Sequence, residues 1–153
     1  MFGELKKWVD ELPLTGTKAN NNNIGTRKGA RINVYQFCKS SGVIASPTST
    51  RGQFTGDREE IMNMLDWHEA NYRSAGSACY AAPALQQAAS DFMNTRNRAY
   101  SVGGGRKRII AFITDSTFAD VSKFSNSMQI LNSLNVNIFS GAIRRYADAT
   151  KAN

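Results

Sequence analysis

The sequence predicts an α/β domain in which strands and helices pack in layers. Segments with strand character alternate along the chain with segments of helical periodicity, and this alternation is typical of α/β folds. Residues 109–114 (IIAFIT) are almost entirely apolar, as in the interior of a parallel sheet, so we expect both faces of this strand to be covered. A chain of 153 residues corresponds to a single domain, 1–153.

Composition and charge indicate which kinds of partner are favoured, but they do not identify a single function. The net charge is +7, from 19 lysines and arginines against 12 acidic residues. This charge favours acidic partners such as nucleic acid, anionic lipid or acidic proteins, and it is equally typical of a solvated basic surface. No apolar run approaches the roughly 18 residues that cross a bilayer, so no membrane span is expected. Charges interrupt the first 16 residues, so no signal-peptide core is expected there.

The first segments predict a short helix and a loop. Apolar residues at helical spacing indicate a helix over residues 2–12, which ends before Pro13. Residues 15–29 have no apolar periodicity and contain four consecutive asparagines and three glycines. We therefore expect 15–29 to be an exposed, flexible loop.

A hairpin is predicted next. Residues 30–37 (ARINVYQF) are rich in β-branched and aromatic side chains, which favour a strand. The sequence KSSG then indicates a turn, and residues 43–46 (VIAS) a second short strand. Residues 47–55 are predicted to be a polar loop.

Residues 56–72 carry a clear helical pattern with a start signal. Asp57 is the predicted N-cap and Glu60 its reciprocal partner, as in a capping box. His68 lies on the apolar face of this helix. Because no second ligand-type residue follows at i+4, we expect His68 to be packed rather than to bind a metal.

The second half of the chain continues the alternation. Pro83 stands in the first turn of a helix, where its missing N–H costs nothing. Three glycines precede a strand, whereas phosphate loops need them after a strand and before a helix, so no phosphate site is expected. The predicted segments are a small-residue loop over 73–81, a helix over 83–93, a glycine-rich loop over 101–108, a strand over 109–114, a helix over 118–134 and a strand over 136–143.

Four pieces carry a family resemblance when they are taken in order: RINVYQF, SAGSACYAAPALQQAASDF, KRIIAFITDS and LNVNIFSGAI. Together they resemble the von Willebrand factor type A (vWA) domain over about residues 1–145. The resemblance implies a three-layer helix–sheet–helix fold, with a mostly parallel sheet and one antiparallel edge strand. It also implies a non-enzymatic protein-binding or adhesion module. The best-known roles of the family favour an extracellular location, with the cytoplasm as the alternative.

The family's metal-ion-dependent adhesion site is only partly written in this chain. Asp115 matches its carboxylate ligand, but Ser116 replaces the following glycine and Cys79 the loop threonine, with Ser77 as a substitute. No DxSxS segment occurs in residues 1–29. Mg²⁺ prefers hard oxygen ligands and a thiol is soft. We therefore expect no cofactor, or Mg²⁺ only if another segment supplies the missing ligands to Asp115 and Ser77. For Asp115 we therefore expect a cap of the next helix rather than a metal ligand.

The family's first strand, which lies between the counterparts of 31–37 and 108–114, is not found, nor are its last strand and helix beyond residue 145. Each buried, unpaired backbone group costs about 1–3 kcal/mol, so an open gap is untenable. Either the flanking strands pair directly, or another segment or chain donates a strand, or the sequence is a piece of a longer protein. We expect the last.

Three functional hypotheses follow. The first is protein binding at the strand ends, through Cys38, Ser40, Ser77, Cys79, Asp115, Ser116 and Thr117. The second is a basic scaffold for nucleic acid or another polyanion, through Arg27, Lys28, Arg31, Arg106, Lys107, Arg108, Arg144 and Arg145. The third, an enzyme, lacks a motif that pairs the single histidine with either cysteine. In a vWA fold both cysteines lie near the top of the sheet, so a disulfide and two free thiols are both open.

Overall fold

The computed structural model describes residues 1–16, 29–39, 42–45, 54–72, 79–94, 107–114 and 117–142. Four α-helices and four strands lie within these ranges, so the predicted mixed α/β class is confirmed. None of the described helices is long and apolar enough to cross a membrane. The elements are α1 (Phe2–Glu11), β1 (Tyr35–Lys39), β2 (Gly42–Ala45), α2 (Arg58–Ala70), α3 (Ala82–Met93), β3 (Arg108–Thr114), the 3-10 turn η2 (Val121–Lys123), α5 (Ser125–Ser133) and β4 (Val136–Ala142).

The strands form two small sheets instead of the single mixed sheet that we expected. β3 and β4 are parallel and in register, with Arg108 opposite Val136 at their first residues. β1 and β2 form an antiparallel hairpin. Within the described strands no ladder joins β1 to β3, so direct pairing of these two strands is not what the structure shows. They meet through side chains instead: the Phe37 and Phe112 rings lie 5.3 Å apart, edge to face.

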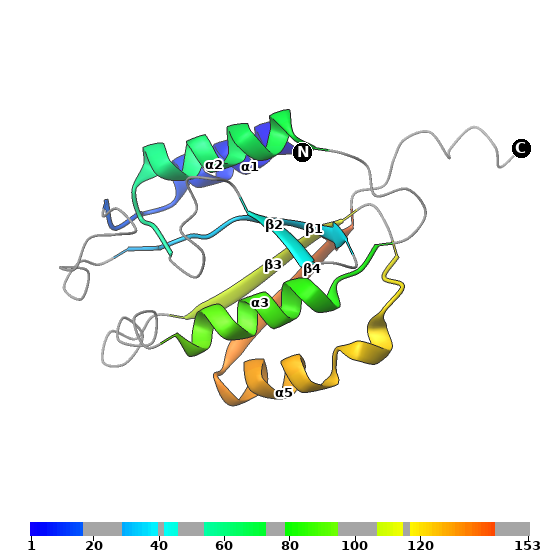
Figure 1. Cartoon of the computed structure of the whole chain (residues 1–153). Helices are drawn as coiled ribbons and strands as arrows, with labels where there is room; N and C mark the ends of the chain where they lie inside the picture. The colour runs from blue at the N-terminus through cyan, green and yellow to red at the C-terminus, as the bar shows by residue number, and fades with distance from the viewer. Residues whose placement is uncertain are drawn as a thin grey trace, which may run out of the picture.

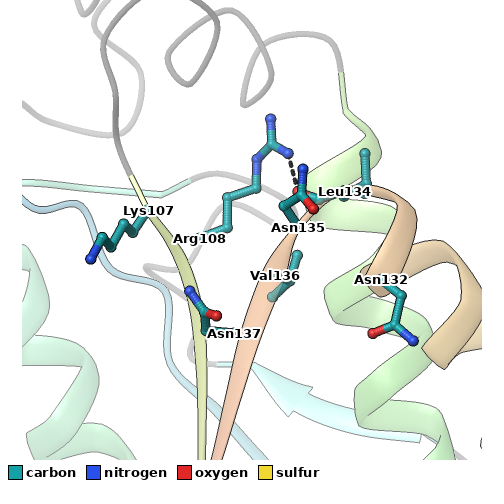
Figure 2. A pocket seen from close by; sticks show the side chains of 7 residues that line it. All are labelled: Lys107, Arg108, Asn132, Leu134, Asn135, Val136 and Asn137. Atoms are coloured by element: carbon teal, nitrogen blue, oxygen red, sulfur yellow. Dashed lines mark hydrogen bonds between the residues drawn. The ribbon is translucent and has the colours of Figure 1, made fainter.

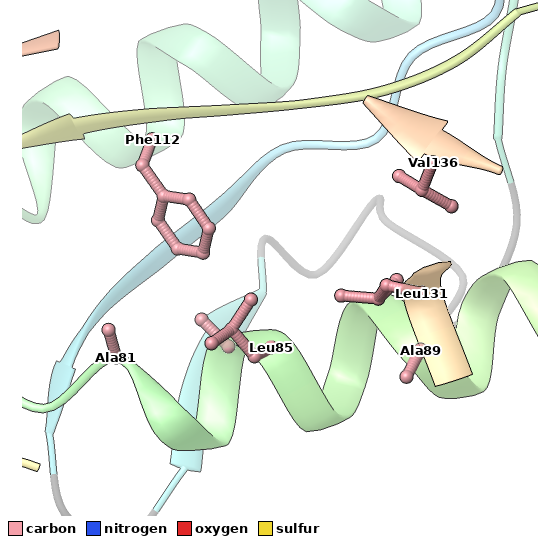
Figure 3. Packing of buried hydrophobic residues seen from close by; sticks show 7 residues of the cluster. Ala81, Leu85, Ala89, Phe112, Leu131 and Val136 are labelled. Carbon is pink, nitrogen blue, oxygen red and sulfur yellow. The ribbon is translucent and has the colours of Figure 1, made fainter. Parts of the chain in front are cut away.

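Helices lie on both sides of the strands. Figure 1 shows α1 and α2 together on one side, with α3 and α5 on the other. α3 and α5 pack against each other, α3 against the β1–β2 hairpin and α5 against β4. In Figure 3, Phe112 of β3 and Val136 of β4 point toward Leu85 of α3 and Leu131 of α5, which belong to one buried cluster. This cluster fixes the position of β3 relative to both lower helices.

The hairpin is confirmed, but its first strand begins later than predicted. β1 starts at Tyr35, and the preceding described residues form two isolated bridges, Ala30 with Leu14 and Ile32 with Thr55. The register shifts between Gln36 and Lys39. Cys38, within this bulge, has φ 88°, a conformation that few residues other than glycine adopt. The alternating β-branched and aromatic residues that predict a strand over 30–37 do not indicate where such a bulge occurs.

A second core holds α1 and α2 together. Val9 of α1 is buried with Ile61, Met64 and Leu65 of α2, and Ile32 packs against them. This apolar contact is completed by Arg58, whose guanidinium donates to the carbonyl of Val9 over 2.5 Å. α1 and α2 therefore pack on the segment that precedes β1.

The start of α2 confirms the predicted N-cap. The Asp57 carboxylate accepts a hydrogen bond from the backbone N–H of Glu60 over 3.0 Å. The return contact of the box passes through Thr55: the Asp57 N–H donates to the Thr55 hydroxyl, and this hydroxyl donates to the Glu60 carboxylate over 2.6 Å. The helix start is thereby tied to the bridge at Thr55.

Two predictions about the second half of the chain are wrong. Residues 109–114 are not covered on both faces: Ile109 is 52% exposed and Phe139, on the neighbouring strand, 60%. α3 and α5 cover only the face that carries Phe112. The single helix over 118–134 is also wrong, since the chain forms η2 and then the shorter α5. The apolar side chains of a strand show that it can be buried. They do not show whether a helix or another sheet packs on each of its faces.

Several predicted loops lie wholly or mostly outside the described residues, namely 17–28, 47–53, 73–78 and 101–106. At the described amino end of the first loop, Gly16 is exposed, as expected, whereas Thr15 is not. Thr15 is buried, and its N–H donates to the Ala30 carbonyl over 3.2 Å. The two ends of the 15–29 segment are therefore held together.

His68 is packed, as predicted, and 1% exposed. Its Nε2 lies 3.3 Å from the Val34 carbonyl, and burial lowers the pKa of the imidazole below 6.5, with the Val34 contact as a smaller opposing effect. Because the folded state resists protonation, stability is full above pH 6.5 and falls as the pH drops toward the lowered pKa.

Replacing His68 by glutamine should therefore flatten the dependence of stability on pH. In the parent chain, acidification from pH 7.5 to 5 is expected to reduce the free energy of unfolding, by up to about 1.4 kcal/mol for each unit of pKa lowering. Urea unfolding at several pH values measures this. Equal slopes for H68Q and the parent would show that His68 does not titrate in this way.

Candidate functional site

The predicted partner-binding residues divide into described and undescribed ones. Ser40, Ser77, Asp115 and Ser116 lie outside the described residues, so their predicted roles stay predictions. Cys38, Cys79 and Thr117 are described. We call the edge that these three residues mark the rim. It lies at the carboxyl ends of β1 and β3, where open α/β sheets bind their ligands.

A disulfide joins two of the rim residues. Cys38, in β1, is bonded to Cys79, just before α3, and the two Cα atoms are 4.1 Å apart. The structure thus decides between the alternatives left open by the sequence. Cys79 is not a free thiol, which removes it as a reactive nucleophile.

Backbone hydrogen bonds bring a third segment to the same place. The Cys38 N–H donates to the Tyr80 carbonyl over 3.2 Å, and the Ala119 N–H donates to the Cys79 carbonyl over 2.8 Å. Cys79 and Phe118 form an isolated parallel bridge. Thr117, next to Phe118, is exposed. The end of β1, the approach to α3 and the segment after β3 therefore converge at the rim.

Asp120 holds the segment after β3 against the start of α3. The sequence did not predict this role. The Asp120 side chain is 4% exposed. One carboxylate oxygen accepts from the Ala81 N–H and the other from the Ala82 N–H, each over 2.9 Å. These donors lie at the amino end of α3, where helix N–H groups have no partner within the helix. Asp120 thus caps a helix that begins 38 residues earlier.

Three phenylalanines support the rim from below. The rings of Phe37, Phe112 and Phe118 lie 5.3 to 6.2 Å apart, and they come from β1, β3 and the segment after β3. Contacts of this kind contribute beyond simple burial of area. The cluster holds β1 beside β3 although no ladder joins them.

The described part of the rim does not fit a magnesium site. The family's threonine falls on Cys79, whose sulfur is bonded to Cys38 and offers no hard oxygen. Among the described residues there is no group of three or more histidine, cysteine or acidic side chains that could hold a metal. Asp115 and Ser77 alone do not supply the six oxygens that Mg²⁺ prefers.

Two further titratable groups are buried away from the rim. Asp91 of α3 is 2% exposed and accepts hydrogen bonds from the Tyr35 hydroxyl over 2.6 Å and the Gln87 amide over 2.7 Å. Burial raises the pKa of Asp91, and these hydrogen bonds act against it. With His68 also buried, both groups serve packing between elements, and neither lies beside the rim cysteines.

Three of the eight residues predicted for polyanion binding are described. Arg27, Lys28, Arg106, Arg144 and Arg145 are outside the described residues. Arg31 donates to the Phe54 carbonyl near the start of the hairpin. Lys107, just before β3, and Arg108, the first residue of β3, line an open groove of about 550 Å³. Figure 2 shows this groove, with Arg108 donating to the Leu134 carbonyl.

Comparison with known proteins identifies no relative of this chain. It matches no protein-family model, no curated protein and no solved structure.

Proposed function

We propose that this chain is a non-enzymatic protein-binding module of the vWA type that engages its partner through the rim. One observation carries the proposal: the Cys38–Cys79 disulfide joins two distant segments at the rim, and the hydrogen bond from the Ala119 N–H to the Cys79 carbonyl adds a third. A surface built in this way is preorganised, which reduces the ordering cost of binding. The three-layer vWA arrangement is part of the proposal.

The disulfide also supports a compartment for this function. Disulfides persist in oxidising environments and are rare in the cytosol, where thiols are kept reduced. A buried Cys79 bonded to Cys38 therefore favours an extracellular or secretory location. This agrees with the adhesion role that the resemblance implies.

Binding in this proposal does not require a metal. The disulfide occupies the position at which the family places a threonine ligand. The partner is accordingly recognised by shape and hydrogen bonds at the rim. Addition of Mg²⁺ or of EDTA is expected to change neither the melting temperature nor the affinity.

Substitution of Thr117 by arginine tests the rim. Thr117 is exposed at the rim, so a long cation there should weaken binding at least tenfold by steric and charge conflict. The matched control is Gln86→Arg, which places the same side chain on an exposed position of α3. Partners are captured by the immobilised chain from extracellular protein, identified, and remeasured as purified proteins. A partner lost by T117R and kept by Q86R supports the proposal. Equal effects of the two variants would contradict it.

A further inference from the structure

A groove separate from the rim opens where β3 and β4 begin and α5 ends. In the part of the chain that the structure describes, its polar lining comprises two cations and three amides: Lys107, Arg108, Asn132, Asn135 and Asn137. Since β3 and β4 are parallel and seven residues long, the groove lies at the opposite end of the sheet, about 20 Å from the rim. We propose that this groove binds an anionic saccharide, a sulfated segment of a glycosaminoglycan chain.

The charge of the groove is the first argument. Among the described residues that line the groove, none is acidic. The end of α5 carries a weak negative charge from its free carbonyls, and the Arg108 guanidinium, which donates to Leu134, offsets it locally. The exposed Lys107 adds a further positive charge. The groove therefore attracts anions.

The placement of the two cations favours a chain over a small ion. In Figure 2, the Lys107 side chain extends to the opposite side from the Arg108 guanidinium, so the two charges do not converge on one point. Charges on two sides of the start of β3 match a ligand that carries several spaced anionic groups. Arg106, the next residue toward the amino end in the sequence, lies outside the described residues.

The three asparagines favour a sugar. Each amide offers both a donor and an acceptor, as a hydroxyl group does, whereas phosphate and sulfate oxygens only accept. Asn132, Asn135 and Asn137 are all exposed. They come from the end of α5, the turn after it and β4. A ligand with both hydroxyl and sulfate groups uses the amides and the cations together.

Two observations disfavour nucleic acid in this groove. No aromatic side chain is among the described residues that line it, although single-stranded nucleic acid is commonly bound by stacking of bases on aromatic rings. The Cys38–Cys79 disulfide favours an oxidising compartment. In such a compartment, sulfated glycans of the heparin type are polyanions that a basic patch can bind.

Titration of the folded chain with a heparin oligosaccharide tests the proposal. We expect binding near physiological salt and an affinity at least fivefold weaker in Lys107→Gln. Loss of one ionic contact should also reduce the slope of log K against log salt by about 1. Asn137→Asp, which adds a carboxylate to the groove, should weaken binding similarly. Arg108 is left unchanged because it also holds the Leu134 carbonyl.

Controls separate the groove from net charge and from the rim. Lys123→Gln makes the same charge change at an exposed position in η2 and should alter the affinity less than twofold, as should T117R. The proposal is overturned if K123Q weakens binding as much as K107Q. It is also overturned if no binding occurs at physiological salt, or if single-stranded DNA of equal charge binds more tightly and depends on Lys107.

Discussion

Replacing both cysteines by alanine is expected to lower the melting temperature by roughly 8–16 °C. The disulfide joins residues 41 positions apart, and closing a loop of this length in the unfolded chain corresponds to about 4 kcal/mol in the chain-entropy treatment. This is a large part of the roughly 5–15 kcal/mol by which domains are stable. Calorimetry of the parent and of the C38A/C79A variant measures the difference.

Reductant provides the control for this prediction. The parent chain in reductant should melt near the temperature of C38A/C79A, and the variant should not respond to reductant. Cys38 has φ 88°, which costs a residue other than glycine about 1–2 kcal/mol. C38G/C79A should therefore be more stable than C38A/C79A by about 1 kcal/mol. A parent that melts at the same temperature with and without reductant would refute the stabilising role of the bond.

Asp120→Ala is expected to reduce the free energy of unfolding by about 2–4 kcal/mol. The substitution removes a cap from α3 and leaves the Ala81 and Ala82 N–H groups, which are buried, without their acceptor. Asp120→Asn should lose less, because one oxygen is kept and can still accept one of the two bonds. Denaturant unfolding at neutral pH measures both values.

Asp66→Ala serves as the matched control for the loss of a carboxylate. Asp66 pairs with Lys6 on the surface, and its side chain is 63% exposed. Such pairs contribute about 0–1 kcal/mol. If D120A destabilises the chain no more than D66A, then Asp120 does not hold the start of α3.

Elements with a strong local pattern could be predicted from the sequence. Asp57 and the apolar face that follows it predict α2, and the structure confirms both the cap and the buried His68. The parallel pair of β3 and β4 likewise follows from apolar strands joined through a helix. In each case the signal lies within a few residues of the element that it specifies.

Features that depend on distant residues could not be predicted in this way. Asp120 ends the sequence TFAD, and the neighbouring residues would predict only that it caps the turn that follows. Its actual partners, the Ala82 and Ala81 N–H groups, lie 38 and 39 positions away. The bulge lies at Cys38, whose disulfide partner Cys79 is 41 positions away. The exposure of Ile109 depends on which helices cover the sheet. The rim as a joined structure is therefore a tertiary feature.

The most direct test of this account is a peptide map of the folded chain, digested with trypsin without reduction and with free thiols blocked. We expect the peptide of residues 32–39, which contains Cys38, to be recovered joined to the peptide of residues 74–96, which contains Cys79. Addition of reductant should separate them. Recovery of both peptides with blocked thiols would contradict the joined rim, and with it the preorganised binding surface and the oxidising compartment inferred from it.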